Sequence, residues 1–333
     1  MKKVYAYFNT SNKYNSIYQQ TMLLIERLET IYHICIPILD KKGFYEHLNQ
    51  DEDVILFPYD TLKFELFRCC RFKNIIFIYH NITPSRFFWT TEPLVAARSF
   101  IGHLQLRLLR YVSNHWIAVS EYNKLELESY GYHQVHLCSN LIKKTQSHVE
   151  KTQEPSLLYV GRIVQNKKCM ELLDVAKTVS ETIDRHISLY IVGSGKENTN
   201  YLRRFRARVK KYSAGNLSIH WLNSLSEEEL SQIYQHCWLY ITLSQHEGFG
   251  LPVCESINNG TPALYTSCGG QEFVLNNVGL TDEESMPQQV ATLLNDQAVL
   301  AELYQQQKKI ITGITIPNYD NEIKRVFDKL LLI

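Results

Sequence analysis

The stretch that decides the fold is "WLYITLSQHEGFGLPVCESINNGTP", residues 238–262. It opens with an apolar run, Trp238–Leu243, which predicts a buried strand. The turn Gly248-Phe249-Gly250 follows, and Pro252 suits the first position of a helix. A buried strand that passes through a glycine turn into a helix is typical of a doubly wound α/β sheet, in which ligands bind beyond the carboxyl ends of the strands.

The same alternation of short apolar runs and longer amphipathic segments extends along the whole chain. In the first half we expect strands at 4–8, 32–38, 54–57, 74–79 and 116–119, and helices at 16–30, 93–112 and 121–130. In the second half we expect strands at 157–160, 189–192, 217–221, 238–243 and 263–265, and helices at 168–183, 202–212, 227–237 and 252–258. Continuous apolar strands separated by helices predict parallel sheets covered on both faces.

The chain has 333 residues, which is more than one compact core usually holds. A polar stretch without periodicity, "KKTQSHVEKTQEP", is the best linker candidate. We therefore expect an α/β protein with two Rossmann-like doubly wound domains, 1–142 and 156–333, joined by a linker at 143–155. With two such domains, the natural ligand site is a cleft between them.

Composition narrows the class of partner. Lysine and arginine number 35 against 34 acids, so a net charge of +1 provides no global field for nucleic acid. Aromatic residues are not interleaved with the basic runs, so we expect no nucleic-acid partner. None of the eight cysteines forms a Cys-x-x-Cys pair, and we expect reduced thiols, a cytoplasmic location and no metal site.

The glycine turn and its two acids predict a ligand with mixed chemistry. The backbone N–H groups of residues 249–252 lie at a predicted helix start, where an anion binds well, although Pro252 itself donates nothing. Glu247 and Glu255, the latter expected in the first helical turn, would repel a phosphate but accept hydrogen bonds from a diol. We therefore expect a ligand that is part anion and part polyol, as a sugar nucleotide is.

Two cations follow an earlier strand of the same predicted sheet. Arg162 lies just past the strand that ends at Gly161, and Lys167 lies five residues further on. Both would stand at the carboxyl edge of the sheet, where they could neutralise a pyrophosphate and a leaving nucleoside diphosphate. The alternative is a solvated basic loop.

Two further features belong to the first half. His80 ends a buried strand in "NIIFIYHNITP" and would face the cleft from the other domain, either as a donor-sugar contact or as a satisfied loop histidine. In the helix at 93–112, His103, Arg107 and Arg110 recur at helical spacing opposite an apolar set, Phe100, Leu104 and Leu108. A basic amphipathic helix can lie on an anionic membrane, so the region near 98–110 is a candidate for peripheral membrane contact, although such runs are more often solvated faces.

These segments together resemble the retaining glycosyltransferases of family 4, which have the GT-B fold. The resemblance is carried by "VGRIVQNKK", "IVGSG", "SEEELSQIYQHCWLYITLSQHEGFGLPVCESINNGTP" and "GGQEFV", in the family's order over nearly all of the second half. The first half resembles the family weakly, through "FIYHNITP" and "HWIAVSEYNKLEL".

The resemblance implies transfer of a sugar from a UDP- or GDP-sugar to a glycan or lipid-linked acceptor, with retention and without a cofactor, and commonly in surface polysaccharide synthesis. It makes 1–142 the acceptor side. Its implied donor-site residues are Arg162 and Lys167 on the diphosphate, Glu247 and His80 on the sugar near the reaction centre, Glu255 on the ribose diol, and the backbone of Phe249, Gly250 and Leu251 on sugar and phosphate.

Two stretches depart from the family pattern. "FNTSNKYNS", residues 8–16, lacks the glycine pair usual after the first strand, and "SNLIK", residues 139–143, lacks the usual glycine and acid. Both departures concern the acceptor side. A nucleotide-sugar epimerase or phosphorylase of the same fold, and a catalytically silent binding module, remain as alternatives, although four converging charged groups argue against the silent module.

Overall fold

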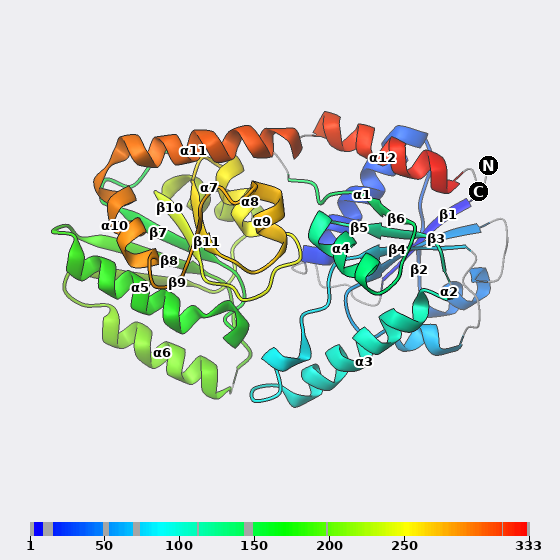
Figure 1. Cartoon of the computed structure of the whole chain (residues 1–333), viewed down its shortest axis with the longest axis horizontal. Coiled ribbons are helices and arrows are strands. Elements are labelled where there is room, and N and C mark those ends of the chain that lie inside the picture. Colours follow the sequence, from blue (N-terminus) through cyan, green and yellow to red (C-terminus); the bar gives the residue numbers. More distant parts are fainter. Residues whose placement is uncertain are drawn as a thin grey trace. The chain divides into compact units, whose positions relative to one another are not determined.

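The computed structural model describes residues 3–8, 16–48, 53–68, 74–111, 113–142, 149–197, 199–314 and 316–331. Within them the chain forms two compact units, Met1–Leu141 with Ile314–Ile333, and Ile142–Gly313 (Figure 1). Each unit is built on a six-stranded parallel sheet, as the continuous apolar strands predict. No helix of the described part of the chain is both long and apolar enough to cross a membrane.

The first unit contains a sheet in the order β2-β1-β3-β4-β5-β6. Its strands are β1 (Lys3–Tyr7), β2 (Ile38–Leu39), β3 (Asp53–Tyr59), β4 (Ile75–Tyr79), β5 (Trp116–Ala118) and β6 (Val135–Leu137). Its helices are α1 (Ser16–Tyr32), α2 (Lys41–His47), η1 (Phe64–Arg68), η2 (Ser85–Phe87), α3 (Pro93–Leu109), α4 (Glu121–Ser129) and α12 (Ile316–Leu331).

The second unit contains a sheet in the order β12-β11-β10-β7-β8-β9. Its strands are β7 (Ser156–Val160), β8 (Ile187–Val192), β9 (Leu217–Leu222), β10 (Leu239–Thr242), β11 (Ala263–Thr266) and β12 (Leu280–Thr281). Its helices are η3 (Gln165–Lys167), α5 (Cys169–Thr182), α6 (Asn200–Tyr212), α7 (Glu227–His236), α8 (Leu251–Asn258), α9 (Gly270–Leu275), α10 (Met286–Asn295) and α11 (Gln297–Ile311). The short helix η4 (Thr312–Ile314) spans the boundary of the unit at Gly313.

Buried apolar side chains cover both faces of each sheet. In the second unit one cluster joins β7 and β8 to α5 and α10, and another joins β10 and β11 to α7 and α8. In the first unit one cluster joins the sheet to α1 and α12, and the other joins it to α2, α3 and α4. Helices on both faces of a parallel sheet define a doubly wound architecture, which confirms the predicted fold class.

The C-terminal helix α12 belongs to a different unit than expected, because residues 156–333 were expected to form one domain. Its buried face, Tyr319, Ile323, Val326, Phe327 and Leu330, packs in the core of the first unit. Arg27 of α1 forms a two-pronged ion pair with Asp320, at 2.9 and 2.6 Å. The last helix therefore completes the first unit, and the second unit ends at Gly313.

The structure also differs from the strand expected at 32–38 and from part of the linker expected at 143–155. The predicted strand at 32–38 is mostly wrong, because α1 continues to Tyr32, His33 has a left-handed φ of 52°, and β2 comprises only Ile38 and Leu39. In the predicted linker, residues 143–148 lie outside the described part. Residues that follow are attached to the second unit, since the Val149 amide donates to Gln235 at 2.9 Å and Lys151 Nζ donates to the Cys237 carbonyl.

Candidate functional site

The strand order of the second sheet reverses between β7 and β10, which lie side by side. In doubly wound sheets ligands bind beyond the carboxyl ends of the strands at such a switch point. Arg162 and Lys167 follow β7, and Glu247 follows β10. The sheet topology therefore brings these three residues to one edge, as the sequence predicts.

Lys167 and Glu247 form an ion pair between Nζ and Oε1. The lysine also donates to the carbonyl of His246 at 3.4 Å. The two side chains are only 14% and 20% exposed, so the pair is shielded from most solvent yet can still be reached from outside. Partial desolvation strengthens the attraction between the two opposite charges, so each side chain holds the other in position.

The side chain of Arg162 is less constrained by contacts than that of Lys167. Its carbonyl accepts a hydrogen bond from the Tyr159 hydroxyl at 3.1 Å, so the backbone is anchored. Its side chain is exposed, and in the described part of the chain no hydrogen bond or ion pair involves the guanidinium. The guanidinium is thus available for a phosphate, which it can contact in a bidentate way.

The backbone around Glu247 is tied to two neighbouring loops. The amide of Gln245 donates to the carbonyl of Asn166, in the loop that carries Lys167, at 2.8 Å. The amide of Glu247 donates to the Cys268 carbonyl at 3.0 Å, and its carbonyl accepts from the Gly270 amide at 2.8 Å. These bonds fix the position of the carboxylate relative to both loops before any ligand binds.

Gly250 caps the N-terminus of α8 and needs to be glycine for two reasons. Its φ is +88°, and a Cβ added there would lie 2.6 Å from the Cβ of Gln271. Among the described residues the amides of Phe249, Gly250 and Leu251 have no backbone acceptor. Amides without an acceptor at the start of a helix attract an anion, and the glycine turn presents three of them at the start of α8.

Glu255 lies one residue deeper in its helix than expected. Because α8 begins at Leu251, Glu255 is in the second helical turn and not in the first. Its Oε2 accepts a hydrogen bond from the buried Tyr234 hydroxyl at 3.0 Å. Desolvation raises the pKa of Glu255, and the bond from Tyr234 partly offsets this shift. One carboxylate oxygen is thus held by the protein.

Two residues of "GGQEFV" support the site and were not singled out from the sequence. Gln271 is fully buried, donates to the Thr266 carbonyl at 3.1 Å and packs against Gly250. Glu272 accepts from the Cys268 and Gly269 amides at 2.5 and 2.7 Å, which caps α9. A capping glutamate three residues after a glycine turn is the sequence signal that could have identified Glu272.

His80 belongs to the first unit, directly after β4. Its Nε2 lies 3.5 Å from the Thr21 hydroxyl of α1, and its amide donates to the Tyr59 carbonyl at 2.9 Å. Desolvation lowers the pKa of His80 to about 4, although Asp60 acts in the opposite direction. The imidazole is therefore neutral at neutral pH and can exchange a hydrogen bond without carrying charge.

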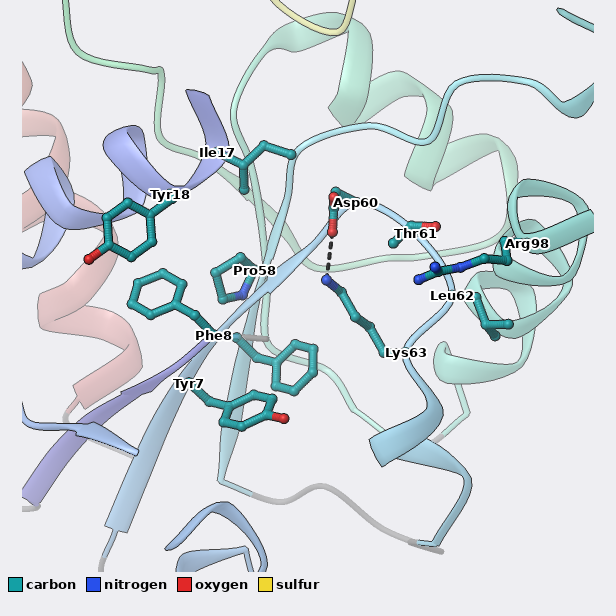
Figure 2. A pocket seen from close by; sticks show the side chains of 11 residues that line it. Tyr7, Phe8, Ile17, Tyr18, Pro58, Asp60, Thr61, Leu62, Lys63 and Arg98 are labelled. Atoms are coloured by element: carbon teal, nitrogen blue, oxygen red, sulfur yellow. Dashed lines mark ion pairs between the residues drawn. The ribbon is translucent and has the colours of Figure 1, made fainter. Parts of the chain in front are cut away.

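The first sheet has its own switch point, between β1 and β3, and a pocket opens there (Figure 2). Aromatic side chains form one side of it, and the residues after β3 form the other, with Asp60 and Lys63 paired at 2.6 Å. The lining residues are Tyr7, Phe8, Ile17, Tyr18, Phe57, Pro58, Asp60, Thr61, Leu62, Lys63 and Arg98.

Three lining residues flank, in the sequence, the stretch that departs from the family pattern. Phe8 precedes residues 9–15, which are outside the described part, and Ile17 and Tyr18 follow them. None of the lining residues was among the predicted site residues. Asp60 could have been found by the rule that located Lys167 and Glu247, because it directly follows the carboxyl end of a buried strand.

The second unit identifies the family. The profile of the family described as "Glycosyl transferases group 1" matches residues 142–313, just over half of the chain. The chain therefore belongs to this family. The matched segment coincides with the second compact unit, which contains every predicted site residue except His80. Family 4 within this group is consistent with the match.

Individual relatives agree with this assignment. The GtfA subunit of a UDP-N-acetylglucosamine–peptide N-acetylglucosaminyltransferase from Streptococcus agalactiae is 28% identical over 143 residues, 41% of this chain and 26% of the relative. The chain thus spans about a quarter of that relative's length. The structure of WaaG, a glycosyltransferase involved in lipopolysaccharide biosynthesis, superposes with a TM-score of 0.70 at 11% identity, covering 97% of this chain and 98% of WaaG.

A second structure of similar length gives the same fold. The lipopolysaccharide outer core galactosyltransferase WaaB aligns with 99% of this chain over 99% of its own, with a TM-score of 0.67 and 13% identity. Likenesses at such low identity establish the architecture, and they confirm that the chain has the GT-B fold.

Proposed function

We propose that the chain transfers a sugar from a UDP- or GDP-sugar to a hydroxyl group of a glycan or lipid-linked acceptor, in surface polysaccharide biosynthesis. The observation that carries this proposal is the ion pair of Lys167 and Glu247 at the switch point of the family-matched sheet. A cation, a carboxylate and a helix N-terminus at one edge suit a donor that is both diphosphate and polyol.

In the proposed donor site, different residues bind different parts of the ligand. Arg162, Lys167 and the amides of Phe249, Gly250 and Leu251 bind the diphosphate. Glu255 holds the ribose diol with the carboxylate oxygen that Tyr234 leaves open. Glu247 positions the sugar by its hydroxyls.

We propose that the reaction proceeds with retention. The bond from the anomeric carbon to the diphosphate oxygen breaks, and the acceptor oxygen bonds to the same face of that carbon. The acceptor's proton passes to the departing phosphate oxygen. Arg162, Lys167 and the α8 amides stabilise the charge on the leaving diphosphate, so we propose that no divalent ion is needed. Neutral His80 contributes a hydrogen bond to the donor sugar.

The acceptor is proposed to bind in the pocket at the switch point of the first sheet. Its aromatic side chains can pack against the apolar face of a sugar ring, and the Asp60–Lys63 pair can exchange hydrogen bonds with hydroxyl groups. We also propose that the protein is cytoplasmic and works in contact with the inner face of the membrane, where a lipid-linked acceptor would be found.

The proposal is tested by thermal unfolding with UDP-, GDP- and CMP-sugars, each with and without EDTA. A native-state ligand raises the melting temperature by mass action, so we expect one nucleotide class to stabilise strongly and EDTA to have no effect. Absence of any shift would refute the donor site. Product analysis with the stabilising donor then separates transfer from the alternatives: an epimerised donor, a sugar phosphate, or no turnover would each refute transferase activity.

A further inference from the structure

The pocket of the first unit has more cations than acids among its lining residues. Its charged lining residues are Asp60, Lys63 and Arg98. Lys63 and Asp60 neutralise each other, because their side chains pair at 2.6 Å and are only 13% and 23% exposed. Within the described residues no hydrogen bond or ion pair involves the guanidinium of Arg98. The positive charge of Arg98 is therefore not offset by an acid of the pocket lining.

Arg98 is directed at the pocket by the way in which α3 packs on the loop after β3. Residues four apart lie on the same side of a helix, so Arg98 and Gly102 share a side. A Cβ on Gly102 would lie 2.8 Å from the amide nitrogen of Leu62, so α3 approaches this loop as closely as glycine permits. Figure 2 shows the Arg98 side chain extending from α3 toward Thr61 and Lys63.

Hydrogen bonds hold the helix and the neighbouring loops in this arrangement. Gln105 accepts from the Lys63 amide at 3.0 Å and donates to the Lys63 carbonyl at 2.8 Å. The hydroxyl of Ser99, the residue after Arg98, donates to the carbonyl of Thr83. The backbone that carries the two cations is thus fixed before a ligand binds, which lowers the entropy cost of binding.

The charged side of the pocket lies close to His80. Desolvation is the main cause of the low pKa of His80, to which Asp60 adds an upward and Lys63 a downward contribution. The Asp60–Lys63 pair is therefore within electrostatic range of the side chain for which a contact with the donor sugar is proposed. A sugar bound at this pair has its hydroxyl groups near His80 and its outer substituents near Arg98.

A solvated surface arginine is the ordinary alternative, because most exposed arginines bind no ligand. Arg98 is exposed, and exposure alone would favour this alternative. Its place in the lining of a pocket and the fixed packing of its helix argue against it. A neutral sugar does not offset the charge of a guanidinium, whereas an oxyanion accepts two parallel hydrogen bonds from it.

We propose that the acceptor sugar carries an oxyanion, a phosphate ester or a carboxylate, and that Arg98 binds this group. The inference rests on the proposed function of the pocket as the acceptor site. A phosphate can belong to the sugar itself or to the diphosphate of a lipid-linked acceptor, and both present the same oxygen atoms to the guanidinium. Arg98 is then a residue that determines acceptor specificity.

Thermal unfolding with matched probes tests this binding. Glucose, galactose and mannose are each added as the neutral sugar, the 6-phosphate, the uronate and the geranyl diphosphate-linked sugar. They are added to the free chain and to the chain saturated with UDP or GDP, which occupies the donor site. We expect a charged form to raise the melting temperature where its neutral form does not, and the form that does so identifies the source of the oxyanion. If no charged form exceeds its neutral partner, the proposal is overturned.

The variant Arg98→Gln assigns the effect to this side chain. It should weaken binding of the charged probe by about tenfold, because a charge-assisted hydrogen bond is lost. Arg98→Lys keeps the charge but not the two parallel donors, so it should lose less. The matched control is Arg107→Gln, because Arg107 belongs to the same helix but lies over the ring of Tyr130 and does not line the pocket. Equal weakening by Arg98→Gln and Arg107→Gln would overturn the proposal.

Failure of this inference and failure of the proposed function give different results. Transfer to a neutral sugar that Arg98→Gln leaves unchanged would overturn the charged acceptor and keep the transferase. A charged-probe shift that Arg98→Gln abolishes, without any effect of UDP or GDP, would keep the oxyanion site and refute the donor site. If both are correct, Arg98→Gln should raise KM for the charged acceptor about tenfold and leave KM for the donor unchanged.

Discussion

The two sheets each have a switch point in their strand order, but different side chains surround the two switch points. At the switch point of the second sheet, between β7 and β10, charged side chains are paired and the backbone is set by glycine. At the switch point of the first sheet, between β1 and β3, aromatic side chains surround one ion pair, Asp60–Lys63. A fixed, charged edge suits a diphosphate common to many donors, whereas a pocket of side chains suits an acceptor particular to this chain.

This difference between the two edges explains why the sequence predicted the residues of the second edge but not those of the first. The second edge is built from short contiguous segments, in which Gly250, Pro252 and the two glutamates follow one strand, so spacing alone predicted the anion site and its acids. The first edge combines Phe8, Tyr18, Asp60 and Arg98 from four segments, and no local pattern links them. Only the rule that sites follow strand ends could have found Asp60.

Long-range partners account for two of the remaining differences between the sequence predictions and the structure, and a local cause accounts for a third. The sequence pattern of α12 predicts an amphipathic helix but not which core receives it, and the contact of Asp320 with Arg27 bridges nearly the full chain length. The strand expected at 32–38 failed for a local reason, because the helical pattern of α1 and the apolar alternation that follows overlap at Tyr32. The role of Gln271 depends on its packing against Gly250, which spacing does not show.

We expect the largest effect, on kcat, from a substitution that disrupts the charged edge of the second sheet. Glu247→Gln keeps the shape but removes the charge that holds Lys167, so we expect kcat to fall by about 10²–10³-fold with donor affinity little changed. The matched control is Glu283→Gln, because Glu283 pairs with the neighbouring Lys168 at a more exposed position. Steady-state kinetics with the donor found by thermal shift provide the measurement. Similar losses in both variants would contradict a specific role for Glu247.

A smaller effect tests the backbone of the same edge. Gly250→Ala should lower the free energy of unfolding by about 2–3 kcal/mol, because alanine is strained at a φ of +88° and its Cβ meets Gln271. Gly260→Ala is the control, since Gly260 has a φ of +92° and no atom within 4 Å of an added Cβ. Urea unfolding should give a loss of about 1–2 kcal/mol for Gly260→Ala from backbone strain alone. If the two variants lose the same amount, the contact with Gln271 contributes nothing.

The next prediction concerns His80 of the first unit and the pH dependence of the free energy of unfolding. Its pKa of about 4 in the folded chain lies below the unfolded value, so the native state binds fewer protons. The stabilisation is complete above the unfolded pKa and is lost as the pH falls toward the folded one. Between about pH 7 and pH 5 this contribution amounts to about 2 kcal/mol. His80→Gln should flatten the dependence of the unfolding free energy on pH by that amount, and an unchanged slope would contradict a desolvated histidine.

The central claim is that the two edges bind different substrates, and calorimetric titration of UDP and GDP tests it most directly. One substitution at each edge serves as the control for the other, Glu255→Ala in the second unit and Tyr18→Ala in the first. We predict that one nucleoside diphosphate binds the wild type, that Glu255→Ala weakens this binding about tenfold by removing the ribose acceptor, and that Tyr18→Ala leaves it unchanged. Binding of neither nucleotide, or equal weakening by both substitutions, would contradict the account.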